Sequence, residues 1–270
     1  MTPLMTRYLT AAPLRSPLDL PRRVASRRPL ALLLCSGLLA TGTALFPAAA
    51  ATAAVSPAAA IRTATAPWAA TWTVTLRSGM KGSSVRTAQL RLAALGYWVG
   101  AADGQYGSQT RQAVLALQKT VGAPRTGVID RAVRNVLTAG IRPKARTTTG
   151  STVEIDLKRQ LLLVVVNGRT VWAFNTSTGN NQYYYQDGVR YLATTPRGRF
   201  GVTRQIDGVR VAPLGVLFRP KYFYGGYAVH GSSNIPAYPA SHGCARVSNA
   251  AIDYLWASRL MPIGRRLWVY

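Results

Sequence analysis

The residues best suited to chemistry in this 270-residue chain are gathered in one short stretch. Its two histidines, His230 and His242, stand fourteen and two positions before Cys244. A cysteine nucleophile needs a base that generates the thiolate, a group that orients the base, and donors for a developing oxyanion. The closeness of these residue types predicts a site that uses Cys244 as its nucleophile.

The segment around Cys244 has a backbone that suits such a site. Ser241–His242–Gly243–Cys244 places the thiol on a glycine-containing bend, where backbone N–H groups can turn toward a bound carbonyl. In an extended segment, His242 and Cys244 would point to the same face because they are two residues apart. His230 ends a predicted strand, which would hold its side chain rigidly beside a neighbouring strand.

A zinc site is the competing interpretation of these residues. The two histidines, Cys244 and a carboxylate such as that of Asp253 provide four possible ligands. However, the His-x-Cys spacing lacks the context of a metal motif, and no acidic residue lies between His230 and Cys244. Taken singly, a cysteine is more often a small buried hydrophobe. We expect neither a metal nor another cofactor.

The charge of the chain restricts its partners. It carries 33 Lys and Arg against 8 Asp and Glu, a formal net charge of +25. Such a field attracts polyanions. The arginines are scattered and no nucleic-acid-binding motif accompanies them, so nucleic acid is not an expected partner. An anionic cell wall or membrane surface fits the charge, as does a merely solvated surface.

Residues 1–53 have the pattern of a signal peptide. Arginines at positions 22, 23, 27 and 28 precede an uncharged run over 29–46 and an Ala-rich stretch over 48–54. This predicts export to the cell wall or the extracytoplasmic space, and an uncleaved segment would anchor the protein in the membrane instead. After cleavage Cys244 would be the only cysteine, so no intramolecular disulfide could form.

Beyond this segment, composition divides the chain into two folded regions. Residues 54–74 are rich in Ala, Thr and Pro and predict a linker, and 141–150 predict a second one. Residues 75–140 predict a helical domain and 151–270 a mostly-β domain. Because each region has its own apolar pattern, we expect the two to fold separately, with an exposed linker between them. We also expect the protein to be a monomer.

Apolar residues at helical spacing predict three short helices within 75–140. Ser83 or Ser84, Ser108 and Asp130 are the predicted N-caps of these helices. Sixty residues in three short helices make a bundle with a thin core. That size suits a binding module better than an enzyme.

Residues 151–270 predict short strands and one helix over about 249–260. Asn167–Gly168 lies between two strand-like runs and is a strong hairpin signal. The predicted architecture is a β-sandwich or a partly open barrel. The strand-like runs, which are β-branched, aromatic or alternating, cover 152–156, 161–166, 170–175, 199–205, 215–218, 227–230 and 266–270.

Two sets of motifs resemble known families. His230–Gly231 and Ser241–Val247 resemble the signature of the L,D-transpeptidase catalytic domain, as do Ser177–Gly179 and Thr195–Phe200. This resemblance covers about residues 151–270. Leu76–Gln118, with its glycine-containing turns, looks like the three-helix peptidoglycan-binding domain. Together they imply a multidomain chain: a small three-helix bundle followed by a β-sandwich-like catalytic domain with one helix.

The resemblance implies an enzyme that forms 3→3 crosslinks between peptidoglycan stem peptides. In this family the cysteine attacks the carbonyl of the third stem residue, expels the terminal D-alanine, and passes the acyl group to an amine of another stem. The resemblance implies Cys244 as the nucleophile and His230 as the base, oriented by the Gly231 carbonyl. It implies the Gly243 and Cys244 N–H groups as oxyanion donors, with Ser241 and His242 supporting the loop.

The resemblance also implies residues that bind the substrate. Arg246 would hold that loop or a substrate carboxylate, and the acyl-donor groove would be lined by Tyr222, Phe223 and Tyr224.

Several alternatives stay open. Water in place of an amine would make the protein an L,D-carboxypeptidase, and an inactive site would make it a wall-binding protein. A zinc peptidase is a further alternative, and the aromatic run at 222–224 is as often part of a core. The expected partners are peptidoglycan stem peptides and glycan, with anionic wall polymers in addition. The expected process is cell-wall biogenesis or remodelling, and with it cell shape.

Overall fold

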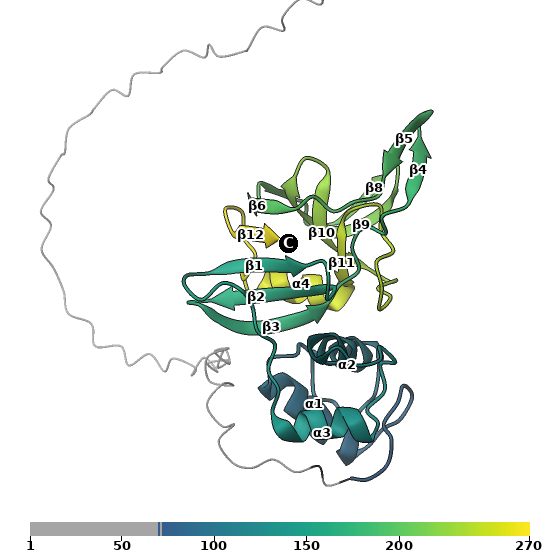
Figure 1. The fold of residues 1–270 in the computed structure, drawn as a ribbon, viewed down its shortest axis with the longest axis vertical. Coiled ribbons are helices and arrows are strands. Elements are labelled where there is room, and N and C mark those ends of the chain that lie inside the picture. The colour runs from purple at the N-terminus through teal and green to yellow at the C-terminus, as the bar shows by residue number, and fades with distance from the viewer. Residues whose placement is uncertain (1–69, 71) are drawn as a thin grey trace, which may run out of the picture. The chain divides into compact units, whose positions relative to one another are not determined.

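The computed structural model describes residue 70 and residues 72–270, all within one compact unit that spans 54–270. The predicted signal peptide and most of the predicted 54–74 linker lie outside the described residues. Three helices come first in the described part, then twelve strands, with a fourth helix between the last two strands (Figure 1). The helices are α1 (Ser83–Ala94), α2 (Ser108–Val121), α3 (Arg131–Ala139) and α4 (Asn249–Ala257).

The helix N-termini match the predicted caps in one case of three. The Asp130 carboxylate accepts a hydrogen bond from the Val133 N–H at 2.9 Å, which confirms it as the cap of α3. The predicted serine caps of α1 and α2 are wrong, because Ser83 and Ser108 are the first helical residues. Glycines precede both helices, and among the described residues no side chain caps either end.

The strands form two larger sheets and one hairpin. The first sheet has the order β3-β2-β1-β12-β6, the second has β11-β10-β9-β7 with β8 also paired to β9, and β4 pairs with β5. The strands are β1 (Thr152–Asp156), β2 (Leu161–Val166), β3 (Arg169–Asn175), β4 (Tyr183–Gln186), β5 (Val189–Leu192), β6 (Gly198–Gly201), β7 (Arg204–Gln205), β8 (Val209–Ala212), β9 (Gly215–Tyr224), β10 (Tyr227–Ser232), β11 (Ala245–Ser248) and β12 (Arg266–Val269).

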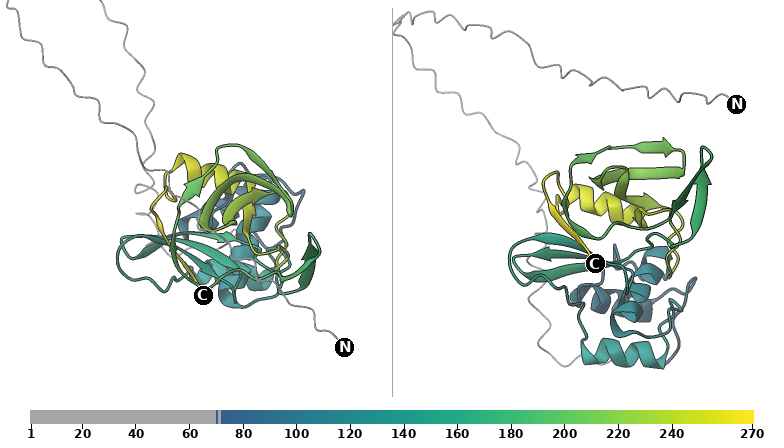
Figure 2. Two further views of the ribbon diagram at one scale, coloured as in Figure 1. Left: turned by 90° about the horizontal axis from the view of Figure 1, so that it is seen from above. Right: turned by 45° about the horizontal axis from the view of Figure 1, so that its top comes forward.

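A sheet–sheet core joins the two larger sheets and α4, as the predicted sandwich requires. It contains Val153 and Ile155 from the first sheet, Val229 and Val247 from the second, and Ile252 from α4. Figure 2 shows the strand layers and α4 from two further directions. The predicted architecture, a helical region followed by a strand-rich domain with one helix, is confirmed.

A second core, the helix–sheet core, lies between the helical region and the first sheet. β2 belongs to both cores, because side chains alternate between the faces of a strand. Leu161, Leu163 and Val165 pack with the helices, whereas Leu162 and Val164 pack in the sheet–sheet core. A strand that is apolar at every position is typical of a strand covered on both faces. The two regions therefore share a core through β2, and their separate folding stays a prediction.

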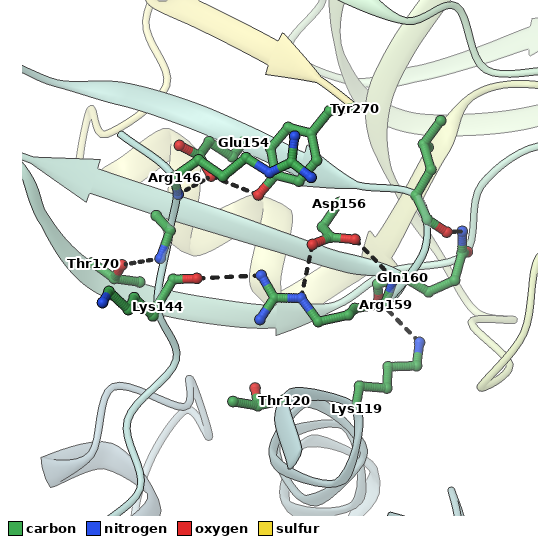
Figure 3. A network of polar contacts seen from close by, with 12 residues as sticks. Lys119, Thr120, Lys144, Arg146, Glu154, Asp156, Arg159, Gln160, Thr170 and Tyr270 are labelled. Carbon is green, nitrogen blue, oxygen red and sulfur yellow. Dashed lines mark hydrogen bonds and ion pairs between the residues drawn. The ribbon is translucent and has the colours of Figure 1, made fainter. Parts of the chain in front are cut away.

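The connection over 141–150 is hydrogen-bonded to the sheet, although seven of its ten residues are exposed. The buried Glu154 carboxylate accepts hydrogen bonds from the Arg146 N–H at 2.9 Å and the Thr147 N–H at 2.6 Å. The Arg159 guanidinium donates to the Lys144 carbonyl while it pairs with a carboxylate of β1 (Figure 3). These bonds fix the path of the chain between the two regions.

Lys119 anchors α2 to the first sheet. Its side chain is 2% exposed, and Nζ donates to the carbonyls of Gln160 and Thr176, both at 3.0 Å. Figure 3 shows the bond to Gln160. Burial, with Arg125 as a second cause, lowers the pKa of Lys119 to about 6. A neutral amine has two N–H groups, which matches the two carbonyls that it meets.

Two hairpins have the turn chemistry that their sequences demand. Asn167 and Gly168 both adopt positive φ, at 50° and 74°, which confirms the predicted hairpin between β2 and β3. Asp187 and Gly188 adopt φ of 52° and 75° between β4 and β5. That second hairpin was not predicted, although Asp-Gly is the same kind of signal. β8 and β11 were also missed.

Among the residues that the structure describes, no helix is long and apolar enough to cross a membrane.

Removing residues 75–140 should destabilise the strand-rich domain. Exposing Leu161, Leu163 and Val165 removes about 1.5–3 kcal/mol of burial free energy for each side chain, a large share of ordinary domain stability. We expect the thermal midpoint of residues 141–270 to lie about 10 °C or more below that of residues 54–270. Circular dichroism measures both, and equal midpoints would support the expectation of separate folding.

Candidate active site

The candidate catalytic residues lie on one face of the second sheet. β10 and β11 are parallel neighbours, and their register pairs His230 with Arg246. Cys244 is two positions before Arg246, so an extended chain directs both to the same face. His230, Ser241, His242, Cys244 and Arg246 all line one cavity of about 510 Å³. The structure thus brings together most of the predicted site.

The buried His230 ring is oriented by its own strand. The side chain is 5% exposed, and Nδ1 lies 2.9 Å from the Gly231 carbonyl oxygen. Because a carbonyl oxygen only accepts, Nδ1 carries the hydrogen and Nε2 is left as the basic nitrogen. Gly231 itself has no room for a side chain, since a Cβ would lie 2.7 Å from Ile252 and 2.8 Å from Phe218.

Burial keeps the imidazole of His230 and the thiol of Cys244 uncharged at neutral pH. It lowers the pKa of His230 to about 4, against the smaller opposite effect of the Gly231 hydrogen bond. Burial also raises the pKa of the Cys244 thiol, although a backbone hydrogen bond with Ala228 and the charge of Arg246 act in the other direction. A neutral imidazole and a neutral thiol are therefore the resting forms.

The bend that carries Cys244 is closed by Ser241. Its hydroxyl donates to the Cys244 carbonyl at 2.6 Å and accepts from the Gly243 N–H at 3.0 Å. The Gly243 N–H, one of the two expected oxyanion donors, is therefore engaged by the Ser241 hydroxyl in this structure. Gly243 has φ of 137°, and a Cβ there would lie 2.5 Å from the Tyr227 ring, so the bend requires glycine.

The residues that follow β3, together with Thr195, hold the bend in place through hydrogen bonds. The Thr178 carbonyl accepts from the Ser241 N–H at 2.9 Å, and the Ser177 N–H and carbonyl pair with Arg246. The Thr195 hydroxyl donates to the Gly243 carbonyl at 2.6 Å and accepts from the Gly179 N–H at 3.0 Å. The sequence resemblance included these residues but assigned them no role.

His242 is placed differently from His230. Its side chain is exposed, and the edge of its ring meets Tyr184 at a centroid distance of 4.8 Å. Tyr184 stacks on Tyr191 across the β4–β5 hairpin and lines the cavity. The hairpin therefore forms part of the wall beside the bend, a contribution that sequence reasoning missed.

The predicted aromatic lining of the groove is wrong for two residues. Tyr222 and Phe223 are 5% and 2% exposed, and each belongs to a hydrophobic cluster. The alternative, that this aromatic run is part of a core, holds for both. Tyr224 is exposed and contacts Phe200 and Tyr227. As far as the described residues define it, the cavity wall contains none of the three and instead includes Tyr184, Leu214, Val216 and Tyr227.

The carboxylate considered for a zinc site is used elsewhere. Asp253 lies on α4 and pairs with Arg219 at 2.7 Å. Among residues 72–270, no three His, Cys, Asp or Glu side chains are grouped so that they could hold a metal ion.

Comparison with known proteins adds two family matches. The family described as the L,D-transpeptidase catalytic domain matches residues 150–265, and a putative peptidoglycan binding domain matches residues 81–137. A crystal structure of an L,D-transpeptidase from Xylanimonas cellulosilytica is 52% identical, with a TM-score of 0.70, and the match covers 72% of this chain and 97% of that one. An L,D-transpeptidase structure from Stackebrandtia nassauensis is 21% identical, with a TM-score of 0.43, over 72% of this chain and 94% of that one.

A curated protein is also similar in part. A probable N-acetylmuramoyl-L-alanine amidase from Bacillus licheniformis is 30% identical over 122 residues, which is 43% of this chain. The match spans 33% of that protein, about a third of its length.

The fold and the two matched domains show that the chain is a cell-wall enzyme. Within it, the chain belongs to the L,D-transpeptidase family.

The raised pKa of the Cys244 thiol predicts how the residue reacts with an alkylating agent. In residues 54–270, where Cys244 is the only cysteine, the rate of iodoacetamide labelling should still be rising above pH 9. The reason is that thiolate is the reactive form and burial raises the pH at which it forms. Mass spectrometry of timed samples gives the rates, with an unstructured cysteine peptide as reference. A plateau below pH 7 would instead indicate a resting thiolate–imidazolium pair.

The two histidines should differ in their effect on turnover. His230 is buried and oriented by a carbonyl, so His230→Ala should lower kcat/KM for a soluble tetrapeptide stem by about two to four orders of magnitude. His242→Ala removes an exposed ring and should lower it less. Thermal unfolding of both variants controls for misfolding, and the opposite ranking would exchange the two roles.

Proposed function

We propose that this chain forms 3→3 crosslinks between peptidoglycan stem peptides through an acyl-enzyme on Cys244. The observation that carries the proposal is the shared cavity, where Cys244 lies with a histidine whose Nδ1–H is held by the Gly231 carbonyl. That arrangement leaves Nε2 of His230 as a proton acceptor beside the sheet face that carries the thiol. The family membership supports the reaction class.

The first half-reaction forms a thioester. Nε2 of His230 takes the proton of the Cys244 thiol as the sulfur attacks the carbonyl carbon of the third stem residue. The carbon–nitrogen bond to the terminal D-alanine then breaks, and the departing amine takes the proton from the imidazolium. Because the resting pair is neutral, this proton transfer belongs to the attack itself.

The second half-reaction releases the enzyme. The side-chain amine of another stem attacks the thioester carbonyl, an amide bond forms, and the sulfur leaves. The amine loses one proton through His230, and the Cys244 thiol is restored. For both steps we propose the Cys244 N–H as an oxyanion donor, since the Gly243 N–H is engaged by Ser241.

Arg246 is proposed to hold a substrate carboxylate. It lines the cavity beside His230 and is half-buried, and burial lowers its pKa while the guanidinium stays charged. A planar guanidinium can bind a carboxylate through two hydrogen bonds. Stem peptides end in such a group, so Arg246 would contribute to orienting the acyl donor.

The helical region is proposed to bind peptidoglycan glycan or stems and so to keep the enzyme at its polymer. The match to a putative peptidoglycan binding domain supports this role, as an effect on local concentration. The proposed location is the cell wall. The high positive charge adds a nonspecific attraction to anionic wall polymers, and salt would weaken that part.

Incubation with a purified tetrapeptide stem tests the proposed reaction. We expect mass spectrometry to find a 3→3 crosslinked dimer and free D-alanine, whereas trimmed tripeptide alone would identify an L,D-carboxypeptidase. Cys244→Ser should lower product formation by more than about a hundredfold, because a hydroxyl is a far weaker nucleophile than a thiolate. Gly201→Ala is a suitable control, since the nearest atom to a Cβ there is 3.9 Å away. A Cys244→Ser variant with near-normal turnover would remove Cys244 from the mechanism.

A further inference from the structure

The loop over 233–240 joins the two halves of the candidate active site. It begins after β10, which carries His230, and leads into the bend that carries Cys244. Its first two residues, Ser233 and Asn234, line the cavity. β10 and β11 are parallel, and such a connection is usually made by a helix. Here the crossover has no helix or strand of its own, so its position depends on what it contacts.

Part of that support comes from the strand-rich domain. The Ser177 hydroxyl donates to the Tyr238 carbonyl at 2.7 Å, and the Ala240 N–H donates to the Thr178 carbonyl at 3.0 Å. Both contacts hold the second half of the loop, close to the bend.

The helical region and Asn175 of β3 hold the first half of the loop. The Gln112 side chain on α2 donates to the Ile235 carbonyl at 3.2 Å and accepts a hydrogen bond from the Asn175 amide. The Asn175 amide also donates to the Ile235 carbonyl, at 3.3 Å. Beyond the end of α2, the Arg125 guanidinium donates to the Ala237 carbonyl at 2.8 Å. These contacts hold the first half of the loop, next to the cavity-lining residues.

We propose that Gln112 and Arg125 are positioning residues of the active site, so that the peptidoglycan-binding helical region is also a structural part of the catalytic machinery. Each acts through the backbone of the 233–240 loop, and neither touches the reacting atoms. The proposal rests on the proposed function in one respect, that turnover occurs at Cys244.

The anchoring of α2 makes this support rigid. Lys119, on the same helix as Gln112, is fixed to the first sheet by two hydrogen bonds, and apolar side chains of α2 pack with those of β2. A rigid helix can hold a carbonyl at a constant place, whereas solvent cannot. Misplacing a reacting group by about 1 Å costs on the order of a hundredfold in rate, so even a small loop shift would be measurable.

The test compares three variants of the full chain. Gln112→Met keeps the length of the side chain and removes its hydrogen bonds to the loop, and Arg125→Met does the same at an exposed position where misfolding is least expected. Gln109→Ala is the matched control, because Gln109 also lies on α2 and accepts a hydrogen bond from Ser248 but does not contact the loop within the described residues. Sacculus binding and thermal unfolding are recorded for each.

We expect Gln112→Met to lower kcat for D-alanine release from a soluble tetrapeptide by about tenfold, with KM within about twofold, and Arg125→Met to lower it less. Amide hydrogen exchange over 233–244 should become about fivefold faster in Gln112→Met and stay unchanged in Gln109→Ala. Release of D-alanine is counted because transfer to an amine and transfer to water both produce it.

Equal kcat and equal exchange in Gln112→Met and Gln109→Ala would overturn the proposal, as would faster exchange with an unchanged kcat. A loss carried by KM or by sacculus binding alone would also overturn it, since that pattern belongs to substrate binding. If the wild-type chain released no D-alanine, the proposed function would fail, and the exchange comparison by itself would decide whether Gln112 positions the loop.

Discussion

The burial of β2 on both faces is the constraint on which the rest of the structure depends. One face closes the sheet–sheet core and the other closes the helix–sheet core, so neither region is complete without this strand. Lys119 orients this contact, because its two hydrogen bonds fix α2 at the start of β2 and the end of β3. The place of the helical region is thus determined by the same apolar surface that holds the sheets together.

The chain uses the end of β3 to transmit this order to the candidate site. Asn175 contacts the 233–240 loop, Ser177 contacts both that loop and Arg246, and Thr178 contacts the bend at Ser241. Each contact joins residues about sixty or more positions apart in the sequence. The Ser241 hydroxyl closes the bend from within, and these contacts attach it to the residues that follow β3.

The electrostatics of the site follow from that packing. His230 is buried and Cys244 half-buried, so burial disfavours the charged form of each. The chain has a strong positive charge, yet among the described residues that line the cavity Arg246 is the only Lys or Arg. The neutral pair of His230 and Cys244 suits a reaction in which the proton moves between them only during attack. The guanidinium of Arg246 suits a substrate that carries a carboxylate.

The sequence by itself determined the features that rest on local patterns. The bounds of β1 and β2, the hairpin at Asn167–Gly168 and the gathering of His230 beside Cys244 follow from alternation, turn chemistry and spacing. The run of apolar residues in β2 also held the signal for a covered second face, which local reasoning did not use. Only the tertiary structure decided that Tyr222 is buried while Tyr184 lines the cavity, and that the Ile235 carbonyl is bound by Gln112. Those outcomes depend on which distant segments meet, and an aromatic or backbone group has the same local pattern whether its neighbour is a core or a cavity.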